Sequence, residues 1–324
     1  MIATRPKFDR NEAAGLALVA GVGLLLWTAS TRYPAAMPVW GPWDFSWSVY
    51  LTAVFACWWY VRGVVRSAPS ERPTFWRRVS YLAGVLTIYA VLQTRYEYMA
   101  QHTFVLDRIQ HMVMHHLGPF LIALAWPGAV LRRGMPAPLC RITGNRHLLR
   151  AVRAVQQPAV AGFLFVGLLG FWLIPAIQLR AMLNPQLYMI MNWSMIIDGV
   201  LFWYLILDPR PGPPARIGFG ARLLLIAATM FPQIAIGAFI SLHSTTLYQF
   251  YDLCGRLYPA LGDLSDQHFG GIVVWESGGS MSVLSFLIVL NRLRKHEERT
   301  ALPVAPAATR GSQVAISSAA WTGR

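Results

Sequence analysis

Long apolar runs separated by short charged or Pro/Gly-rich stretches dominate the chain. Each run has roughly 20 residues, the length that an α-helix needs to cross a hydrocarbon core about 30 Å thick. Buried helices of soluble proteins seldom reach this length so many times in one chain. The pattern predicts eight transmembrane helices, at residues 13–30, 46–66, 79–99, 109–131, 158–180, 186–207, 218–243 and 267–291.

The predicted fold class is therefore all-α, a polytopic helical bundle integral to a membrane. We expect an N-terminal anchor with its outer connection at 1–45, a seven-helix core at 46–295 and a disordered tail at 296–324, which is rich in Ala, Ser, Thr and Pro. The first run follows a basic stretch, so a cleaved signal peptide is the alternative to an uncleaved helix there. Its apolar run is long for a signal peptide, and cleavage would leave the orientation of the other helices unchanged.

The overall composition agrees with a membrane protein. Hydrophobic residues make up 55% of the chain, and charged residues only 13%, about half the fraction usual in soluble domains. The mean hydropathy is +0.43 and the sequence pI is about 10.3. The net charge of +14 would indicate nucleic-acid binding in a soluble protein, so its distribution along the chain decides its meaning.

The basic residues alternate from one loop to the next. If the N-terminus is cytoplasmic, 23 of the 28 Lys and Arg residues fall in inner segments, and the outer segments hold only Arg32, Arg95, Arg108, Arg180 and Arg256. This is the positive-inside pattern of membrane proteins, and it predicts that both termini are cytoplasmic. The surplus charge then follows from topology, and we expect no nucleic-acid partner.

The histidines gather on the predicted outer side of the membrane. Two of the eight, His147 and His296, fall inside. The other six lie at the predicted outer face: His102, His111, His115, His116, His243 and His268.

The segment His-Met-Val-Met-His-His at 111–116 has the spacing of a metal site. His111 and His115 are four residues apart, so they share a helix face and two imidazoles from one helix can bind one metal. Met114 flanks that face, and imidazole with thioether suits copper. The alternative is that these histidines bond water, lipid or carbonyl groups at the headgroup level. Pro119 cannot donate to the His115 carbonyl, which predicts a bend there.

Two carboxylates fall deep within predicted helices, at Asp198 and Glu276. Burying such groups in a membrane is costly, so they mark functional or structural sites. We expect both to face the bundle interior as metal ligands, proton carriers or hydrogen-bond anchors. The three cysteines, Cys57, Cys140 and Cys254, form no Cys-x-x-Cys pair, which excludes a thioredoxin-like site and c-type haem attachment.

Several of these segments resemble the CtaG-type cytochrome c oxidase assembly factors, over about residues 59–290. The first signature is similar at His111–His116 with Pro119, and continues to Ala125-Trp126-Pro127. The last helix resembles the family's other signature. Its matching residues are Asp266, Gln267, Gly270, Gly271, Ile272 and Trp275. Weaker similarities lie at Phe202-Trp203-Tyr204 with Asp208-Pro209 and at Leu247-Tyr248 to Tyr251.

The chain also departs from the family pattern. Family members usually have Trp-His-x-Pro where this chain has Leu173 after Trp172, and Asn192 stands at the place of another family histidine. Asp198 and Glu276 stand where uncharged residues are more usual. The chain is therefore either a branch with a rearranged site or one that has lost metal binding.

The resemblance implies a non-enzymatic assembly factor for a haem–copper cytochrome c oxidase in a bacterial inner membrane, with oxidase subunits and membrane lipid as partners. We expect copper to bind His111 and His115 near the outer surface. The residues expected to complete the site are Met114, His243, His268 and Asp266.

Three alternatives belong to other classes of protein. A transporter of copper or another small solute would use a polar path at Asp198 and Glu276. A b-type cytochrome would need facing histidines, such as His115 and His243. A metal-free scaffold would hold oxidase subunits through apolar helix faces.

Overall fold

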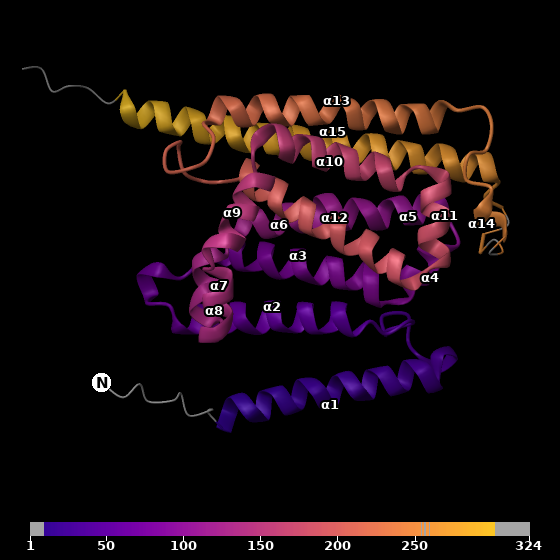
Figure 1. Cartoon of the computed structure of the whole chain (residues 1–324), viewed down its shortest axis with the longest axis horizontal. Coiled ribbons are helices and arrows are strands. Elements are labelled where there is room, and N and C mark those ends of the chain that lie inside the picture. Colours follow the sequence, from indigo (N-terminus) through magenta and orange to yellow (C-terminus); the bar gives the residue numbers. More distant parts are fainter. Residues whose placement is uncertain (1–9, 254, 256, 259, 302–324) are drawn as a thin grey trace, which may run out of the picture.

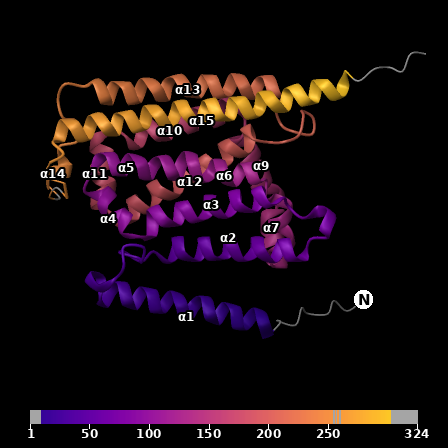
Figure 2. The same ribbon diagram turned by 180° about the vertical axis from the view of Figure 1, so that it is seen from behind.

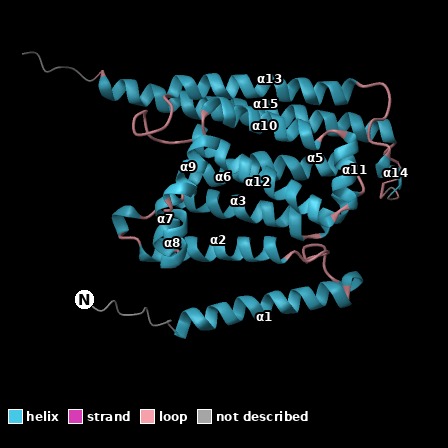
Figure 3. Ribbon diagram, viewed as in Figure 1, coloured by secondary structure: helices cyan, strands magenta, loops and turns pink. Residues whose placement is uncertain are grey.

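The computed structural model describes residues 10–253, 255, 257–258 and 260–301. Helices and short connections make up this part of the chain, and it contains no β-strand (Figure 3). The predicted all-α class is therefore confirmed. The last helix continues to Thr300 and so includes the first residues of the predicted disordered tail. Residues 302–324 of that tail lie outside the described residues. Cys254 lies outside them as well.

The helices follow one another with few residues between them. In chain order they are α1 (Arg10–Arg32), η1 (Pro34–Ala36), α2 (Trp47–Arg66), η2 (Pro69–Glu71), α3 (Phe75–Gln93), α4 (Arg95–Gln101), α5 (Phe104–His111), the π-helical η3 (Met112–Leu117), α6 (Gly118–Ala125), α7 (Gly128–Gly134), α8 (Ala137–Thr143), α9 (Arg146–Val155), α10 (Pro158–Trp172), α11 (Pro175–Leu183), α12 (Pro185–Ile206), α13 (Phe219–Leu242), α14 (Phe250–Leu253) and α15 (Asp263–Thr300).

Five of the described helices, α1, α2, α12, α13 and α15, are long and apolar enough to cross a membrane. Two bent pairs raise the number to seven: Phe104–Ala125 with α7, bent by 79°, and α9 with α10, bent by 71°. Helix α3, which overlaps most of the predicted span 79–99, is not among them, and its first turn carries Arg77 and Arg78. The chain is thus a multi-pass membrane protein, but the predicted count of eight spans is not confirmed.

The long helices run side by side, and the connections between them alternate between two ends of the bundle (Figures 1 and 2). Residues 67–74, 126–157 and 207–218 lie at one end, which we call the basic end because it carries the arginine-rich connections. Residues 33–46 and 94–103 and the described residues between 243 and 262 lie at the opposite end. The loops that the sequence assigns to one side therefore do share one end, while the orientation in the membrane stays a prediction. Helix α1 lies along the edge of the bundle, next to α2 (Figure 1).

Helices α13 and α15 approach each other at backbone distance. A Cβ atom on Gly271 would lie 2.4 Å from the backbone nitrogen of Ser241, and one on Gly237 would lie 2.4 Å from that of Trp275. Small residues permit such close packing of helices in membranes. Gly271 of the last-helix signature thus has a packing role.

Replacing Gly271 by Ala should separate these two helices. Inserting even one methyl group against backbone atoms costs about 1–3 kcal/mol, so we expect a lower thermal midpoint for the purified protein in detergent. Gly279→Ala is the matched control, because a Cβ there meets nothing within 4 Å. Equal midpoints for the two variants would contradict the close packing.

Candidate functional site

The candidate site is built on α5 and the π-helical turn that follows it. The start of α5 is held by the last helix: Asp266 Oδ2 accepts from the Phe104 backbone N–H and Oδ1 from that of Val105, both at 2.8 Å. The first backbone N–H groups of a helix lack partners within the helix, so a carboxylate there acts as a cap. The neighbouring Gln267 accepts from the Leu247 N–H at 2.6 Å. The signature pair Asp266-Gln267 therefore orders both α5 and the connection before α14.

The π-helical turn at Met112–Leu117 takes the place of the predicted bend at Pro119. The Gly118 N–H donates to the Val113 carbonyl, five residues back. The His115 carbonyl, for which Pro119 supplies no N–H, accepts instead from the indole nitrogen of Trp203 at 3.3 Å. The helix continues to Ala125, and the sharp bend follows there, where Trp126 has a φ of 51°.

Gly199 on α12 lets that helix reach the π-helical turn. A Cβ at this position would lie 2.4 Å from the His115 carbonyl oxygen. The close approach brings Asp198, the preceding residue, level with the histidines. Inserted π turns of this kind are frequent at functional sites.

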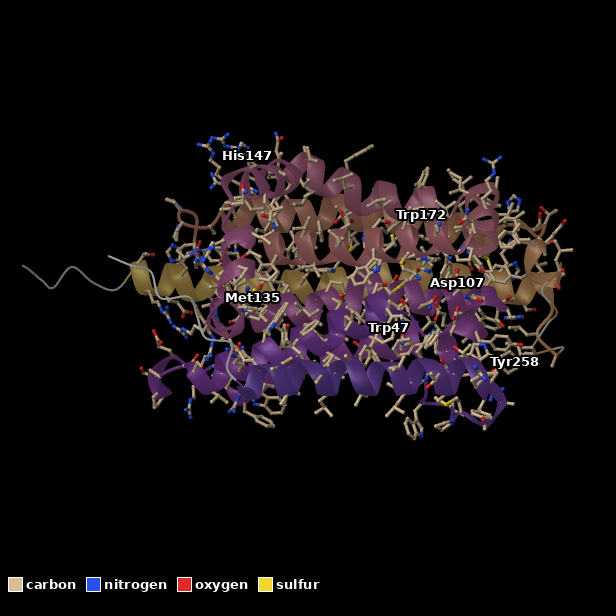
Figure 4. The ribbon with its side chains drawn as sticks, turned by 60° about the horizontal axis from the view of Figure 1, so that its bottom comes forward. Trp47, Asp107, Met135, His147, Trp172 and Tyr258 are labelled. Carbon is tan, nitrogen blue, oxygen red and sulfur yellow. The ribbon has the colours of Figure 1, made fainter. Side chains whose placement is uncertain are left out.

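A buried charged group surrounds His111. Asp107, one turn earlier on α5, forms an ion pair with Arg108, and its Oδ2 accepts from Gln178 Nε2 at 2.8 Å. Gln178 Nε2 also lies 2.8 Å from the hydroxyl of Tyr251. His111 Nδ1 is 2.9 Å from the Asp107 carbonyl oxygen and 3.5 Å from its Oδ1. Figure 4 shows Asp107 in the half of the molecule away from His147, which lies at the basic end.

His115 and His116 lie one turn further into the bundle and are also buried. His115 Nε2 is 3.0 Å from Oδ2 of Asp198, and its ring stacks on Phe165 with centroids 4.2 Å apart. The ring of His116 packs edge-on against Phe165 and Trp203. The exposed fractions of His111, His115 and His116 are only 3%, 0% and 2%.

These contacts determine which ring nitrogens are free. Because Nδ1 of His111 points at a carbonyl, it carries the proton, and Nε2 keeps a lone pair with no partner among the described residues. By the same reasoning Nε2–H of His115 donates to Asp198, and its Nδ1 is free. Neither nitrogen of His116 has a partner in this part of the chain. Histidines that bind metals are oriented in this way, by a carbonyl or carboxylate on the other nitrogen.

The structure does not bring the other predicted ligands to these histidines. Met114 packs in an apolar cluster with Val91 and Ile196, and Asp266 caps α5. His268 and His243 lie near each other between α13 and α15, with His268 Nε2 3.4 Å from the His243 carbonyl. No three His, Cys, Asp or Glu side chains within the described ranges converge as a metal site.

The two predicted intramembrane carboxylates have different positions. Asp198 is buried with an exposed fraction of 6% and is paired with His115. Glu276 is exposed on the outside of α15. The expectation that both face the bundle interior holds for Asp198 and is wrong for Glu276, because α15 packs on α13 and α5 with its other sides.

Leu173 and Asn192, which stand at the places of family histidines, are both buried but have different surroundings. Leu173 is buried in an apolar cluster, and its carbonyl accepts from the Tyr248 hydroxyl at 2.9 Å. Burial raises the pKa of Tyr248 to about 12, so this hydroxyl stays protonated and available as a donor. Asn192 is buried, and its Oδ1 has no partner within the described residues.

Sequence reasoning missed the group around Asp107. Its members, Asp107, Arg108, Gln178 and Tyr251, come from three separate segments, so their meeting depends on the tertiary fold. The sequence does contain one indication of this group. Asp107 and Arg108 stand four and three residues before His111, about one helical turn away. The predicted span 109–131 places both residues in an outer connection, whereas α5 begins at Phe104.

Replacing Trp203 by Phe should destabilise the π-helical turn. The ring packing is largely kept, but the His115 carbonyl loses its indole donor, and a buried carbonyl without a partner costs about 1–3 kcal/mol. We expect a lower thermal midpoint of the purified protein. Trp27→Phe, on the exposed side of α1, is the control, and an equally small effect of both changes would show that the indole bond is unimportant.

The comparisons with known proteins identify the family of the chain. Residues 58–296 match the family described as the cytochrome c oxidase caa3 assembly factors. The match begins within α2, includes α3 to α14 and ends within the last turns of α15. Neither the curated proteins nor the solved structures contain a match. Since the match covers more than half of the sequence, the chain belongs to the cytochrome c oxidase caa3 assembly factor family.

Proposed function

We propose that this chain assists the assembly of a caa3-type cytochrome c oxidase by handling copper at His111, His115 and His116. The observation that carries the proposal is the state of the three imidazoles. Two are oriented by an oxygen on one ring nitrogen and leave the other nitrogen free, and the third leaves both free. Neutral imidazole is a good copper ligand.

The surrounding groups support this role. Asp198 accepts from His115, and the Asp107 carbonyl accepts from His111; such contacts fix the tautomer of a ligating ring and increase its basicity. Copper here is cargo and has to leave again. Imidazoles that do not fill the coordination sphere leave a position for a donor from the receiving protein, which suits transfer.

The first test is the copper content of the purified full-length protein. We expect His111→Ala with His115→Ala to lose bound copper. Asp198→Asn, which weakens the orienting contact, should lower copper affinity roughly tenfold or more. His147→Ala, an exposed histidine of α9 at the basic end, is the matched control. Equal copper content in the double variant and the wild type would refute the ligand assignment.

A metal-free scaffold is the second candidate function. It is favoured by the observation that no three His, Cys, Asp or Glu side chains converge as a metal site in the described part of the chain. On this view the charged groups around His111 hold the helices in register, and oxidase subunits dock on the bundle. A solute path along Asp198 and Glu276 has less support, because only Asp198 is buried.

Oxidase assembly in cells separates the two functions. If the chain handles copper, the His111→Ala and His115→Ala double variant should accumulate at normal levels while the amount of active oxidase falls severalfold. Added copper should restore part of that activity. If the chain is a scaffold, the double variant should assemble active oxidase as well as the wild type does.

A further inference from the structure

Glu276 lies within α15, the longest of the described helices, which is long and apolar enough to cross a membrane. Asp266, at the end of α15 opposite the basic end, is ten residues earlier, which corresponds to about 15 Å along a helix and about half of a hydrocarbon core. Arg292, towards the basic end, is sixteen residues later, or about 24 Å. A glutamate side chain is far shorter than either distance, so its carboxyl group cannot reach a headgroup region on either side.

The surface around Glu276 is mainly apolar, with exposed Ser280 one turn later on the same face. The side chains of Ile272, Trp275 and Val283 are 48%, 42% and 54% exposed, and Glu276 is exposed among them. Its carboxylate receives no hydrogen bond and forms no ion pair within the described residues. The hydroxyl of Ser280 donates to the backbone carbonyl of Glu276, not to its carboxylate. We call the surface formed by Ile272, Trp275, Glu276, Gly279 and Val283 the Glu276 face.

A carboxylate in this position is costly when it faces lipid alone. Intramembrane ionisable groups are retained where they pair with another polar group or line a functional path. Gly279, one turn from Glu276, has open space where a Cβ would be. Small residues beside a polar side chain are the usual composition of helix–helix contacts in membranes, because they let the backbones approach while the polar groups bond across the contact.

We propose that the Glu276 face binds a transmembrane helix of an oxidase subunit that presents an arginine, a lysine or another hydrogen-bond donor at mid-membrane depth. The proposal rests on the proposed assembly function and names the surface that would contact the client. Charge complementarity favours a different protein over a second copy of this chain. A twofold contact of two Glu276 faces would bring the same carboxylate from each copy together.

Site-specific photocrosslinking in cells that make the oxidase tests the proposal. The probe is a photoreactive amino acid in place of Val283 in the full-length chain, with the same probe in place of Phe231 on α13 as control; Phe231 is 65% exposed on a different helix. We expect the probe at 283 to crosslink an oxidase subunit, identified by mass spectrometry, within a transmembrane helix next to a basic or donor residue. The probe at 231 should give no such product.

Substitutions at Glu276 test the carboxylate itself. Combining the probe with Glu276→Leu should lower the yield of this product about tenfold, and Glu276→Gln should keep part of it because an amide still bonds to a donor. Crosslinks to a second copy of the chain, crosslinks to lipid alone, or an unchanged yield with Glu276→Leu would each overturn the proposal. A thermal midpoint for Glu276→Leu at or above the wild-type value checks that the variant folds.

The crosslinking test of the Glu276 face and the copper test of the proposed function can fail independently. Glu276 is outside the group around His111, so Glu276→Leu should keep the copper content of the wild type. If oxidase assembly depends on His111 and His115 but no crosslink depends on Glu276, only the docking surface is wrong. If assembly does not depend on those histidines but the crosslink forms, the docking surface stands, and the chain acts as a scaffold.

Discussion

The two hydrogen bonds from Asp266 to the start of α5 connect the two signature regions of this protein. They determine where α5 begins, and therefore the depth at which Asp107, His111 and His115 follow along the same helix. The carboxylate belongs to α15, whose place is determined in turn by its backbone contact with α13 at Gly237 and Gly271. The position of the histidines thus depends on packing between helices that are far apart in the sequence.

A transmembrane helix has no water with which to satisfy its backbone groups, so every interruption needs a partner from the protein. Pro119 interrupts the ladder at the His115 carbonyl, and the π-helical turn with the Trp203 indole provides the partner. The same interruption lets two adjacent histidines, His115 and His116, both be buried against Phe165. The π-helical turn thus does two things. It places the His115 carbonyl next to a hydrogen-bond donor, and it places both imidazoles in the interior of the bundle.

Hydropathy was sufficient to predict the all-α class and the helices near 46–66, 186–207 and 218–243. The distribution of Lys and Arg predicted that the arginine-rich loops share one end. Hydropathy was not sufficient for α3, where the predicted span 79–99 is divided between α3 and α4 at Thr94. The reason is that hydropathy reports transfer into lipid and carries little information on where a helix is capped or broken.

The candidate site was predicted only in part, because several partners of its histidines come from segments that are distant in the sequence. The spacing of His111 and His115 pointed to a segment whose histidines are buried together, and their role as ligands stays a prediction. The contact of His115 with Asp198 depends on the π-helical turn and on α12. The side on which Glu276 lies was predicted wrongly, because a carboxylate was expected to avoid lipid. The pattern of small residues indicates the packed side better: Gly and Ser are frequent among the buried residues of α15, and small residues are enriched where helices pack in membranes.

The complete burial of the three imidazoles has a kinetic consequence. Phe165 packs against the rings of His115 and His116, and Trp203 packs against that of His116. If copper binds these rings as proposed, it would enter and leave only when the surrounding helices shift, a collective motion on the scale of microseconds or longer. The residence time of the ion would then be governed by how often the bundle opens and not by the strength of its bonds alone.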